Sequence, residues 1–353
     1  MPEPKHDCPL TVDDPVTIGW VGCGGISHVH MKGLELHPEL RVVAGVDVDL
    51  ARAKDWCGQY DVGQSFEDWR EMIEQVQPEV VVFTTWPVQH HEQVIGAAEL
   101  GVPAVLSEKS FSMTGEEADA MLEVCKTLGT VVMEAFMYRH MPRTRDFLER
   151  VHSGDFGAVR SANASFSNFF YNPQGDNWRN RRETGGGIVY DFTCYSVNVL
   201  RAVFGRRPLR VIATGETCPV QNIIITLHGL LDYGDGVVAR VESSQKSTFR
   251  MDCEVVLEQG VLTLPQFLMN RHRADGGALP WHETTGTWVE SQETVDVPTQ
   301  FENPYGLQMV NLARQLREGA ASGMPVEETC DNMHTIDALV RSYEEDCWVE
   351  VGA

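Results

Sequence analysis

Short apolar runs alternate with helix-like segments from Val16 to Ala135, and this alternation constrains the fold more than any other feature of the chain. Runs such as VTIGWVG, RVVAGVD and EVVVFTT are almost unbroken by polar residues. A strand that is apolar on both sides needs cover on both faces of its sheet, and strands separated by helices pair in parallel. The region therefore predicts a doubly wound α/β domain with a parallel sheet.

The pattern changes after residue 136. A helix-like segment at 143–157 precedes several strand-like runs at 209–264, and only turn residues separate these runs. Successive strands without helices between them imply an antiparallel sheet. Two later segments, 303–319 and 329–345, carry the apolar stripe of a helix. We therefore expect a second, α+β domain with an open, mostly antiparallel sheet.

A glycine turn lies between the first strand-like run and the first helix-like segment, in VTIGWVGCGGISHVH. Gly22, Gly24 and Gly25 allow a tight turn and a close approach of the backbone to a pyrophosphate, which the helix N-terminus then stabilises. The third glycine of the usual fingerprint is Ser27 in this chain. Because strand, turn, helix and second strand follow in the expected order, the motif predicts dinucleotide binding by a Rossmann domain. A glycine-rich turn in a domain that binds no nucleotide is the alternative.

The chain has 353 residues, which is more than most single domains contain. We expect a dinucleotide-binding Rossmann domain at 14–136 and an α+β substrate and oligomerisation domain at 137–328. The remaining segment, 329–353, is predicted to form a C-terminal helix and strand that pack back on the Rossmann domain.

Asp47 ends the second apolar run, RVVAGVD. A carboxylate there would accept hydrogen bonds from the ribose hydroxyls of the adenosine and repel a 2′-phosphate, which favours NAD over NADP. Arg52 could reach the same region, so NADP stays open. A solvated acid at a strand end is the structural alternative.

The net charge of −23 argues against nucleic acid or an anionic membrane as partner, because both would repel so acidic a surface. The sequence has no apolar run long enough to span a bilayer. Its first residues, MPEPKHDCPLTVDDP, lack the basic start and apolar centre of a signal peptide. We expect a cytoplasmic protein.

The nine cysteines are scattered and contain no C-x-x-C pair. This pattern is typical of buried thiols in a reducing compartment rather than of a disulfide framework or a zinc site. The histidine pairs His28 and His30, and His90 and His91, have no carboxylates or cysteines at a recognisable ligand spacing. We expect no metal.

Two further motifs carry polar groups in unusual places. Glu108 and Lys109 follow the buried run VPAVLS, and active sites of parallel sheets lie at the carboxyl ends of strands. In ETGGGIVYDFTCYSVNVLR, three glycines precede a helix-like segment in which Asp191, Tyr195 and Asn198 fall on one side. We expect the glycines to let the chain pass close to substrate and cofactor, and the helix to present these side chains.

These motifs together resemble the glucose–fructose oxidoreductase, inositol dehydrogenase and rhizopine-catabolism (Gfo/Idh/MocA) family. The resemblance rests on the glycine turn, the EK pair, EAFMYRHMP, GGGIVYDFTCY and NPYGLQMVNLARQLREG, and it spans roughly residues 16–351. It is strongest for the branch of sugar dehydrogenases, 3-ketosugar reductases and dihydrodiol dehydrogenases, which carry Tyr where inositol dehydrogenases carry His. It implies a two-domain oxidoreductase whose open sheet serves substrate closure and oligomer contacts, as a homodimer or homotetramer.

By this resemblance, Lys109 matches the catalytic lysine of the family, Tyr195 its general acid/base, and Asp191 the acid four residues earlier. A free tyrosine has a pKa near ~10, and a nearby ammonium lowers it by stabilising the phenolate. Tyr195 could then take a proton from a substrate hydroxyl as hydride leaves for the nicotinamide, or return it in reduction. Asp191 could orient the substrate or Lys109. The structural alternative is a capping Asp and a core Tyr.

The sequence departs from the family at two places. Its EKP motif is EKS here, and since proline restricts the residue before it, Ser110 leaves the backbone of Lys109 less fixed. Trp86 stands where the family more often has a small residue before Pro87, and could pack on the nicotinamide or the adenine. His91 matches the histidine that starts the following helix in the family, with a structural or a cofactor role.

The predicted ligand contacts follow from the glycine turn, the strand ends and the resemblance. The cofactor-binding residues are Gly22, Cys23, Gly24, Gly25, Ile26, Asp47, Thr85, Trp86, Pro87, His91, Glu108 and Lys109. The substrate residues are Tyr138, Arg139, His140, Trp178, Arg179, Asp191, Tyr195 and Asn198. Arginines and aromatic rings suit a polyhydroxylated or anionic ligand, although charge on a loop is often only solvated.

We therefore expect an NAD(P)-dependent oxidoreductase that acts on a secondary alcohol or ketone of a sugar, cyclitol or cyclic diol. One alternative is an enzyme that keeps NAD bound and uses transient oxidation to drive a hydrolysis or elimination. Another is a non-enzymatic regulator that senses a dinucleotide or a sugar. Retention of Lys109, Asp191 and Tyr195 favours the enzyme.

Overall fold

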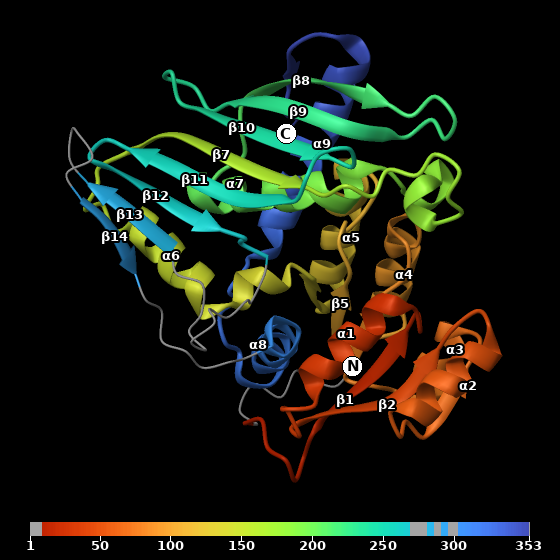
Figure 1. Ribbon diagram of the computed structural model, residues 1–353. Helices are drawn as coiled ribbons and strands as arrows, with labels where there is room; N and C mark the ends of the chain where they lie inside the picture. Colours follow the sequence, from red (N-terminus) through yellow and green to blue (C-terminus); the bar gives the residue numbers. More distant parts are fainter. Residues whose placement is uncertain (1–8, 269–280, 286–290, 296–302, 353) are drawn as a thin grey trace. The chain divides into compact units, whose positions relative to one another are not determined.

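The structure is a computed structural model that describes residues 9–268, 281–285, 291–295 and 303–352 (Figure 1). It divides into two compact units. The first contains residues up to 112, 117–140 and 302–326, and the second contains the rest. Each unit is built around one sheet.

The sheet of the first unit has six strands in the order β3-β2-β1-β4-β5-β6, and every neighbouring pair is parallel. Its strands are β1 (Val16–Val21), β2 (Leu40–Val46), β3 (Gln64–Phe66), β4 (Val80–Phe83), β5 (Ala104–Ser107) and β6 (Val131–Glu134). All four residues of β4 and of β5 are buried, as unbroken apolar strands covered on both faces require. The predicted doubly wound Rossmann sheet is confirmed.

Helices connect these strands. They are α1 (Gly25–Leu34), α2 (Leu50–Gln59), α3 (Trp69–Val76), α4 (Pro87–Glu99) and α5 (Gly115–Leu128), followed by the short 3₁₀ helix η1 (Met137–His140). Asp49 and Asp68 cap α2 and α3, because each side chain accepts hydrogen bonds from two backbone N–H groups of the first turn.

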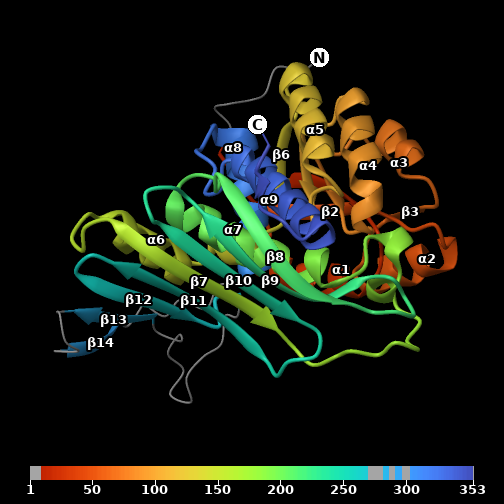
Figure 2. The same cartoon turned by 90° about the horizontal axis from the view of Figure 1, so that it is seen from above.

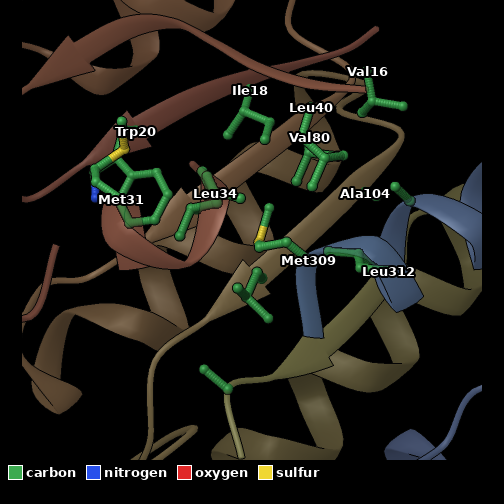
Figure 3. Packing of buried hydrophobic residues seen from close by; sticks show 14 of the residues in the cluster. Val16, Ile18, Trp20, Met31, Leu34, Leu40, Val80, Ala104, Met309 and Leu312 are labelled. Carbon is green, nitrogen blue, oxygen red and sulfur yellow. The ribbon is translucent and has the colours of Figure 1, made fainter. Parts of the chain in front are cut away.

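The helix α8 (Pro304–Glu318), far along the chain, also belongs to the first unit. Its Met309 and Leu312 lie in one apolar cluster with residues of α1 and the strands (Figure 3). Gly33 and Gly306 let the two helices touch, because a Cβ on Gly33 would lie 2.5 Å from the Gly306 nitrogen. The sequence placed this helix in the second domain, and the structure corrects that boundary.

The second unit holds a nine-stranded sheet in the order β14-β13-β12-β11-β7-β10-β9-β8-β15. The strands are β7 (Val159–Ser167), β8 (Arg210–Thr217), β9 (Ile224–Asp232), β10 (Val238–Ser244), β11 (Arg250–Leu257), β12 (Gly260–Pro265), β13 (Trp281–Thr285), β14 (Ser291–Val295) and β15 (Val349–Glu350). Only the β7–β10 pair is parallel. The predicted open, mostly antiparallel sheet is confirmed.

Helices cover one face of this sheet, and Figure 2 shows the strands lying side by side across it. The helices are α6 (Pro142–His152), the short 3₁₀ helices η2 (Trp178–Asn180) and η3 (Arg182–Thr184), the π-helical turn η4 (Val189–Thr193), α7 (Cys194–Phe204) and α9 (Val326–Glu345). The turn η4 and the helix α7 pack on β7 and β10.

The C-terminal segment forms the predicted helix and strand, α9 and β15, and both belong to the second unit. The packing of residues 329–353 on the Rossmann domain stays a prediction. Val349 of β15 pairs with Val211 of β8, and the Ser342 hydroxyl accepts a hydrogen bond from the Ala213 N–H at 2.9 Å. Without β15, the N–H and C=O groups along the edge of β8 would lack sheet partners. The pairing of β15 with β8 supplies these hydrogen bonds.

Candidate active-site residues

The glycine turn joins β1 to α1 in the first unit. Gly22 has a φ of +96°, and a Cβ there would lie 2.8 Å from the Thr84 carbonyl oxygen, so this position requires glycine. A Cβ on Gly24 or Gly25 would meet nothing within 4 Å. The α1 N-terminus has no side-chain cap at Gly24. The turn thus leaves open space before a helix N-terminus, which fits the pyrophosphate of a dinucleotide.

Ser27 replaces the third glycine and has a specific local role. Its hydroxyl donates to the Gly24 carbonyl at 2.6 Å and accepts from the Trp56 indole nitrogen at 2.9 Å. The side chain is fully buried. The substitution therefore ties the turn to α2, and Cys23 and Ile26 lie in the same tied turn.

Asp47 lies at the end of β2, and both of its carboxylate oxygens accept hydrogen bonds from the protein itself. Its Oδ2 accepts the Cys23 N–H at 3.0 Å, and its Oδ1 accepts the Asp49 N–H at 3.0 Å and a guanidinium hydrogen of Arg52 at 3.1 Å. The pKa of the Cys23 thiol rises to about 12, through burial first and the Asp47 charge second. An acid and an arginine thus share this strand end.

The segment Thr85–Pro87 joins β4 to α4. The Thr85 hydroxyl lies 2.5 Å from Gln93 Oε1, Pro87 is the first residue of α4, and Trp86 precedes it with 42% of its surface exposed. An exposed indole at this edge of the sheet is available for a ring of the cofactor. His91 is half-buried in the first turns of α4.

Lys109 follows the carboxyl end of β5. The sheet ladder ends at Glu108, whose N–H donates to the Phe83 carbonyl at 2.9 Å. The Lys109 N–H then donates to Glu108 Oε2 at 3.2 Å. The fully buried Ser110 offers its carbonyl oxygen to His90 Nδ1 at 2.8 Å. Ser110 was expected to leave this backbone less fixed, but hydrogen bonds hold it on both sides of Lys109.

Asp191, Tyr195 and Asn198 lie in the second unit with 1%, 6% and 0% of their surfaces exposed. Asp191 belongs to the π-helical turn η4, and the other two belong to α7. The predicted helix therefore begins with a wider turn than an α-helix, a feature often found at functional sites. The Tyr195 ring packs edge-on against Phe166 of β7, with centroids 5.8 Å apart.

Arg179 of η2 donates from Nε to Asp191 Oδ2 at 2.6 Å, and its guanidinium lies over the Trp178 ring at 4.6 Å from the centroid. Two residues predicted to contact substrate are thus joined to the predicted catalytic acid. In this pair the aspartate side chain is buried and the arginine side chain is partly exposed.

The glycines of 185–187 explain how η2 reaches Asp191. A Cβ on Gly186 would lie 2.5 Å from the Arg181 carbonyl oxygen and 2.7 Å from the carbonyls of Trp178 and Arg179. The glycines were expected to allow close approach to substrate and cofactor. The close approach observed at Gly186 is to the backbone of η2 itself.

Tyr138, Arg139 and His140, predicted to contact substrate, form η1 of the first unit and are all buried. His140 Nδ1 lies 2.8 Å from Asn311 Nδ2 of α8. The structure therefore gives His140 a packing partner inside the first unit.

Sequence reasoning missed three buried residues next to the predicted lysine. His30 lies on α1, with Nε2 at 2.7 Å from Glu108 Oε1. Gln308 of α8 contacts the other ring nitrogen of His30 at 3.4 Å. The third residue is His90, whose Nδ1 lies at hydrogen-bond distance from the Ser110 carbonyl oxygen. Burial lowers the pKa of His90. Nothing in the local sequence distinguishes these residues, because their partners are 20 to 278 residues away along the chain.

The described part of the chain contains no group of three or more His, Cys, Asp or Glu side chains that could hold a metal ion. No helix within the described ranges is long and apolar enough to cross a membrane. The eight cysteines within those ranges are free thiols, and all but Cys347 are buried.

Comparisons with known proteins identify the family of the chain. The profile described as "Oxidoreductase family, NAD-binding Rossmann fold" matches residues 16–136, and the profile of the GFO/IDH/MocA C-terminal domain matches residues 144–263. The D-xylose 1-dehydrogenase (NADP(+)) 2 of Haloferax volcanii is 31% identical over 335 residues, which cover 94% of this chain and 99% of that protein.

Two solved structures share the fold. The aldose–aldose oxidoreductase of Caulobacter crescentus, complexed with glycerol, has a TM-score of 0.85 at 20% identity and covers 95% of this chain and 99% of its own. A levoglucosan dehydrogenase in complex with NADH and levoglucosan has a TM-score of 0.84 at 18% identity, with 96% and 100% covered. Both halves of the chain match one family, and the glycine turn fits its dinucleotide. The chain belongs to the Gfo/Idh/MocA family of NAD(P)-dependent oxidoreductases.

Proposed function

We propose that this enzyme transfers hydride between NAD(P) and a secondary alcohol or ketone of a sugar, cyclitol or cyclic diol. The observation that carries the proposal is the position of Lys109, two residues after the end of β5 in an NAD-binding domain, with its N–H held by Glu108. The carboxyl ends of parallel strands are where such sheets bind their ligands. The sugar class is supported by relatives named for D-xylose, levoglucosan and a dTDP-linked ketosugar.

Tyr195 is the proposed general acid/base. The bound nicotinamide supplies or accepts the hydride. Tyr195 removes the proton of the substrate hydroxyl in oxidation and returns it to the carbonyl oxygen in reduction. The edge-on contact with Phe166 limits rotation of its ring. The ammonium of Lys109 is proposed to stabilise the phenolate and so make proton acceptance possible near neutral pH.

Arg179, Trp178 and Asp191 are the proposed sugar contacts in the second unit. The Nε of Arg179 is taken by Asp191, which orients the guanidinium. The two terminal nitrogens of Arg179 are proposed to donate to the substrate. Such a planar pair of donors suits a vicinal diol or a carboxylate. The Trp178 ring beside it offers an apolar face to the carbons of a sugar ring. Tyr138, Arg139, His140 and Asn198 are further proposed substrate contacts, and all four are buried, as Asp191 and Tyr195 are.

Cofactor choice rests on Asp47 and Arg52. Asp47 can accept ribose hydroxyls, and Arg52, which is 55% exposed, can turn toward a 2′-phosphate. We propose that the enzyme accepts both NAD and NADP, with NAD preferred. Trp86 is proposed to stack on the adenine or the nicotinamide, since its ring is partly exposed at the same sheet edge.

The test combines binding with turnover. NADH and NADPH are titrated into the purified protein by nicotinamide fluorescence, and a panel of aldoses, cyclitols and cyclic diols that includes D-xylose is then screened with both oxidised cofactors. Tyr195→Phe should bind dinucleotide like the wild type and lose turnover by at least about 100-fold.

Three results would redirect the proposal. Turnover of a substrate without net change in nicotinamide would indicate transient oxidation with hydrolysis or elimination. Dinucleotide binding without turnover of any substrate would favour a regulator. Binding of neither dinucleotide would remove hydride transfer from consideration.

We also propose a reducing, cytoplasmic location and a homodimer or homotetramer through the open face of the second sheet. The buried free thiols support the proposed reducing location. The open face carries hydrogen bonds between side chains of neighbouring strands. Examples are Arg240 Nε to Asn163 Oδ1 at 2.7 Å and Arg250 to Glu242 at 3.1 Å. Sedimentation of the wild type against an Arg250→Glu variant tests the assembly.

A further inference from the structure

His30 and Glu108 form a buried pair in the first unit. His30 is fully buried and Glu108 is 6% exposed, and Nε2 of the imidazole lies 2.7 Å from Oε1 of the carboxylate. A carboxylate can only accept hydrogen bonds, so Nε2 carries the hydrogen and donates it. Such a charge-assisted bond is short and directional.

The second oxygen of the same carboxylate faces the predicted catalytic residue. Glu108 Oε2 accepts the backbone N–H of Lys109 at 3.2 Å. One carboxylate therefore bridges α1 and the amide of Lys109, using one oxygen for each. Rotation of the carboxylate would break both bonds, so the donor on Oε1 determines where Oε2 points.

The imidazole ring is itself held on every side. Its centroid lies 4.7 Å from the Tyr305 ring and 5.3 Å from the Trp20 ring, both edge-on, and Gln308 contacts Nδ1 at 3.4 Å. Burial, and then the charge of Glu108, raises the pKa of Tyr305. These contacts, together with the bond to Glu108, hold the ring of His30 with Nε2 toward the carboxylate.

The hydrogen bonds around Lys109 hold its backbone at a point where the strand β5 has already ended. The ladder of β5 ends with the N–H of Glu108 on the Phe83 carbonyl, and Lys109 is the next residue. Ser110 follows where the family pattern has proline, and the imidazole of His90 holds its carbonyl from the other side. Side chains therefore supply the constraint that a proline ring would supply.

We propose that His30 is a positioning residue which, through Glu108, fixes the backbone of Lys109 for catalysis. The inference rests on the proposed function of Lys109, and it assigns to α1 a second task besides binding the pyrophosphate. His30 contacts Glu108, and the Glu108 carboxylate contacts the Lys109 amide, so the proposed effect of His30 passes through the carboxylate.

The first test needs no substrate. Hydrogen exchange of the Lys109 amide is followed in protein labelled with ¹⁵N-lysine, with the resonance assigned by Lys109→Arg. We expect His30→Met to speed this exchange at least about tenfold, because the carboxylate loses its orienting donor. His30→Gln, which matches Met in length but carries an N–H donor, should restore protection.

His37→Leu is the matched control. His37 and Glu39 form another histidine–carboxylate pair in the same unit at 3.2 Å, and both lie outside the proposed catalytic machinery. This variant should leave exchange at Lys109 unchanged. Unchanged exchange in His30→Met would overturn the proposal, as would equal acceleration at amides of β4 and β5, which would indicate general loosening of the sheet.

The second test uses the sugar that the screen identifies. His30→Met should lower kcat about 10- to 100-fold with the Kd for NADH within about twofold of the wild type, since a small misplacement of a catalytic group affects the chemical step. The double variant with Lys109→Ala should be no slower than Lys109→Ala alone. Independent, multiplying losses would overturn the proposal.

The same set of variants separates failure of the inference from failure of the proposed function. If Lys109→Ala retains full turnover, the proposed role of Lys109 is wrong whatever His30 does. If Lys109→Ala is inactive and His30→Met behaves as the wild type in both tests, only the positioning role of His30 is wrong.

Discussion

Arg179 and Asp191 form an ion pair with a 2.6 Å N–O distance, in which 38% of the arginine side chain and 2% of the aspartate side chain are exposed. The pair ties the loop of η2 to the π-helical turn before α7. The same turn leads directly into α7, which carries Tyr195.

Removing the arginine should therefore harm both stability and substrate binding. Arg179→Ala leaves a buried carboxylate without this donor, and we expect the free energy of unfolding to fall by about 1–3 kcal/mol. KM for the identified sugar should rise more than kcat falls. Urea unfolding and steady-state kinetics measure the two effects.

Arg181→Ala is the matched control on the same loop. Arg181 pairs with Asp176, and both side chains are exposed, so its loss should leave the stability essentially unchanged. A loss of stability as large as that of Arg179→Ala would contradict the importance of the buried partner.

Two glycines should respond to substitution in opposite ways. Gly186→Ala puts a Cβ among three backbone carbonyls, which should cost about 1–3 kcal/mol or more of unfolding free energy. Gly24→Ala meets no atom within 4 Å in the protein, so it should fold normally and weaken NADH binding, because the pyrophosphate needs that space. Thermal unfolding and fluorescence titration distinguish them; normal NADH affinity in Gly24→Ala would place the dinucleotide elsewhere.

Asp47 and Arg52 should control cofactor choice in opposite directions. Asp47→Ala removes the acceptor for the ribose hydroxyls and the charge that repels a 2′-phosphate. The affinity for NADH should therefore fall, and the affinity for NADPH should rise relative to that for NADH. Arg52→Ala should weaken NADPH about 10-fold and change NADH little. The ratio of the two Kd values, measured for each variant, checks the prediction; equal losses for both dinucleotides in Arg52→Ala would exclude a phosphate contact.

Buried thiols should make the protein sensitive to alkali. Burial raises the pKa of Cys125 to about 11 and that of Cys253 to about 12, from an ordinary value of 9.0. Between pH 9.0 and these values the folded protein keeps a proton that the unfolded chain releases, so stability is full below pH 9.0 and falls as pH rises. Each thiol contributes a slope of up to about 1.4 kcal/mol per pH unit.

Urea unfolding at pH 8 to 10.5 measures this slope. Cys253→Ala should flatten it, while the exposed Cys347→Ala serves as control and should not. An unchanged slope in Cys253→Ala would show that this thiol does not ionise on unfolding in that range.

The sequence predicted the first sheet well because its signals are local. Unbroken apolar strands, the glycine turn and Asp47 at a strand end depend on neighbours within a few residues, and the parallel order follows from the helices between the strands. The same reasoning detected α8 and α9 as helices but not the unit each joins. Both carry an apolar stripe, and only the close crossing at Gly33 and Gly306 decides that α8 lies on α1.

The candidate residues divide in the same way. The order of motifs and the ends of apolar runs can be read from neighbouring residues. They were therefore enough to predict the family, the Rossmann domain, the mostly antiparallel second sheet, and the places of Lys109 after a strand and Tyr195 on a helix. Folding was needed to show that Arg179 holds Asp191, that Gly186 packs on η2, and that His30 bonds Glu108 across a separation of 78 residues. The first two contacts depend on how one loop folds back on itself, and the third joins residues far apart in the chain. A buried polar group pairs with whatever group folding brings within hydrogen-bond distance, and no local sequence pattern encodes that partner.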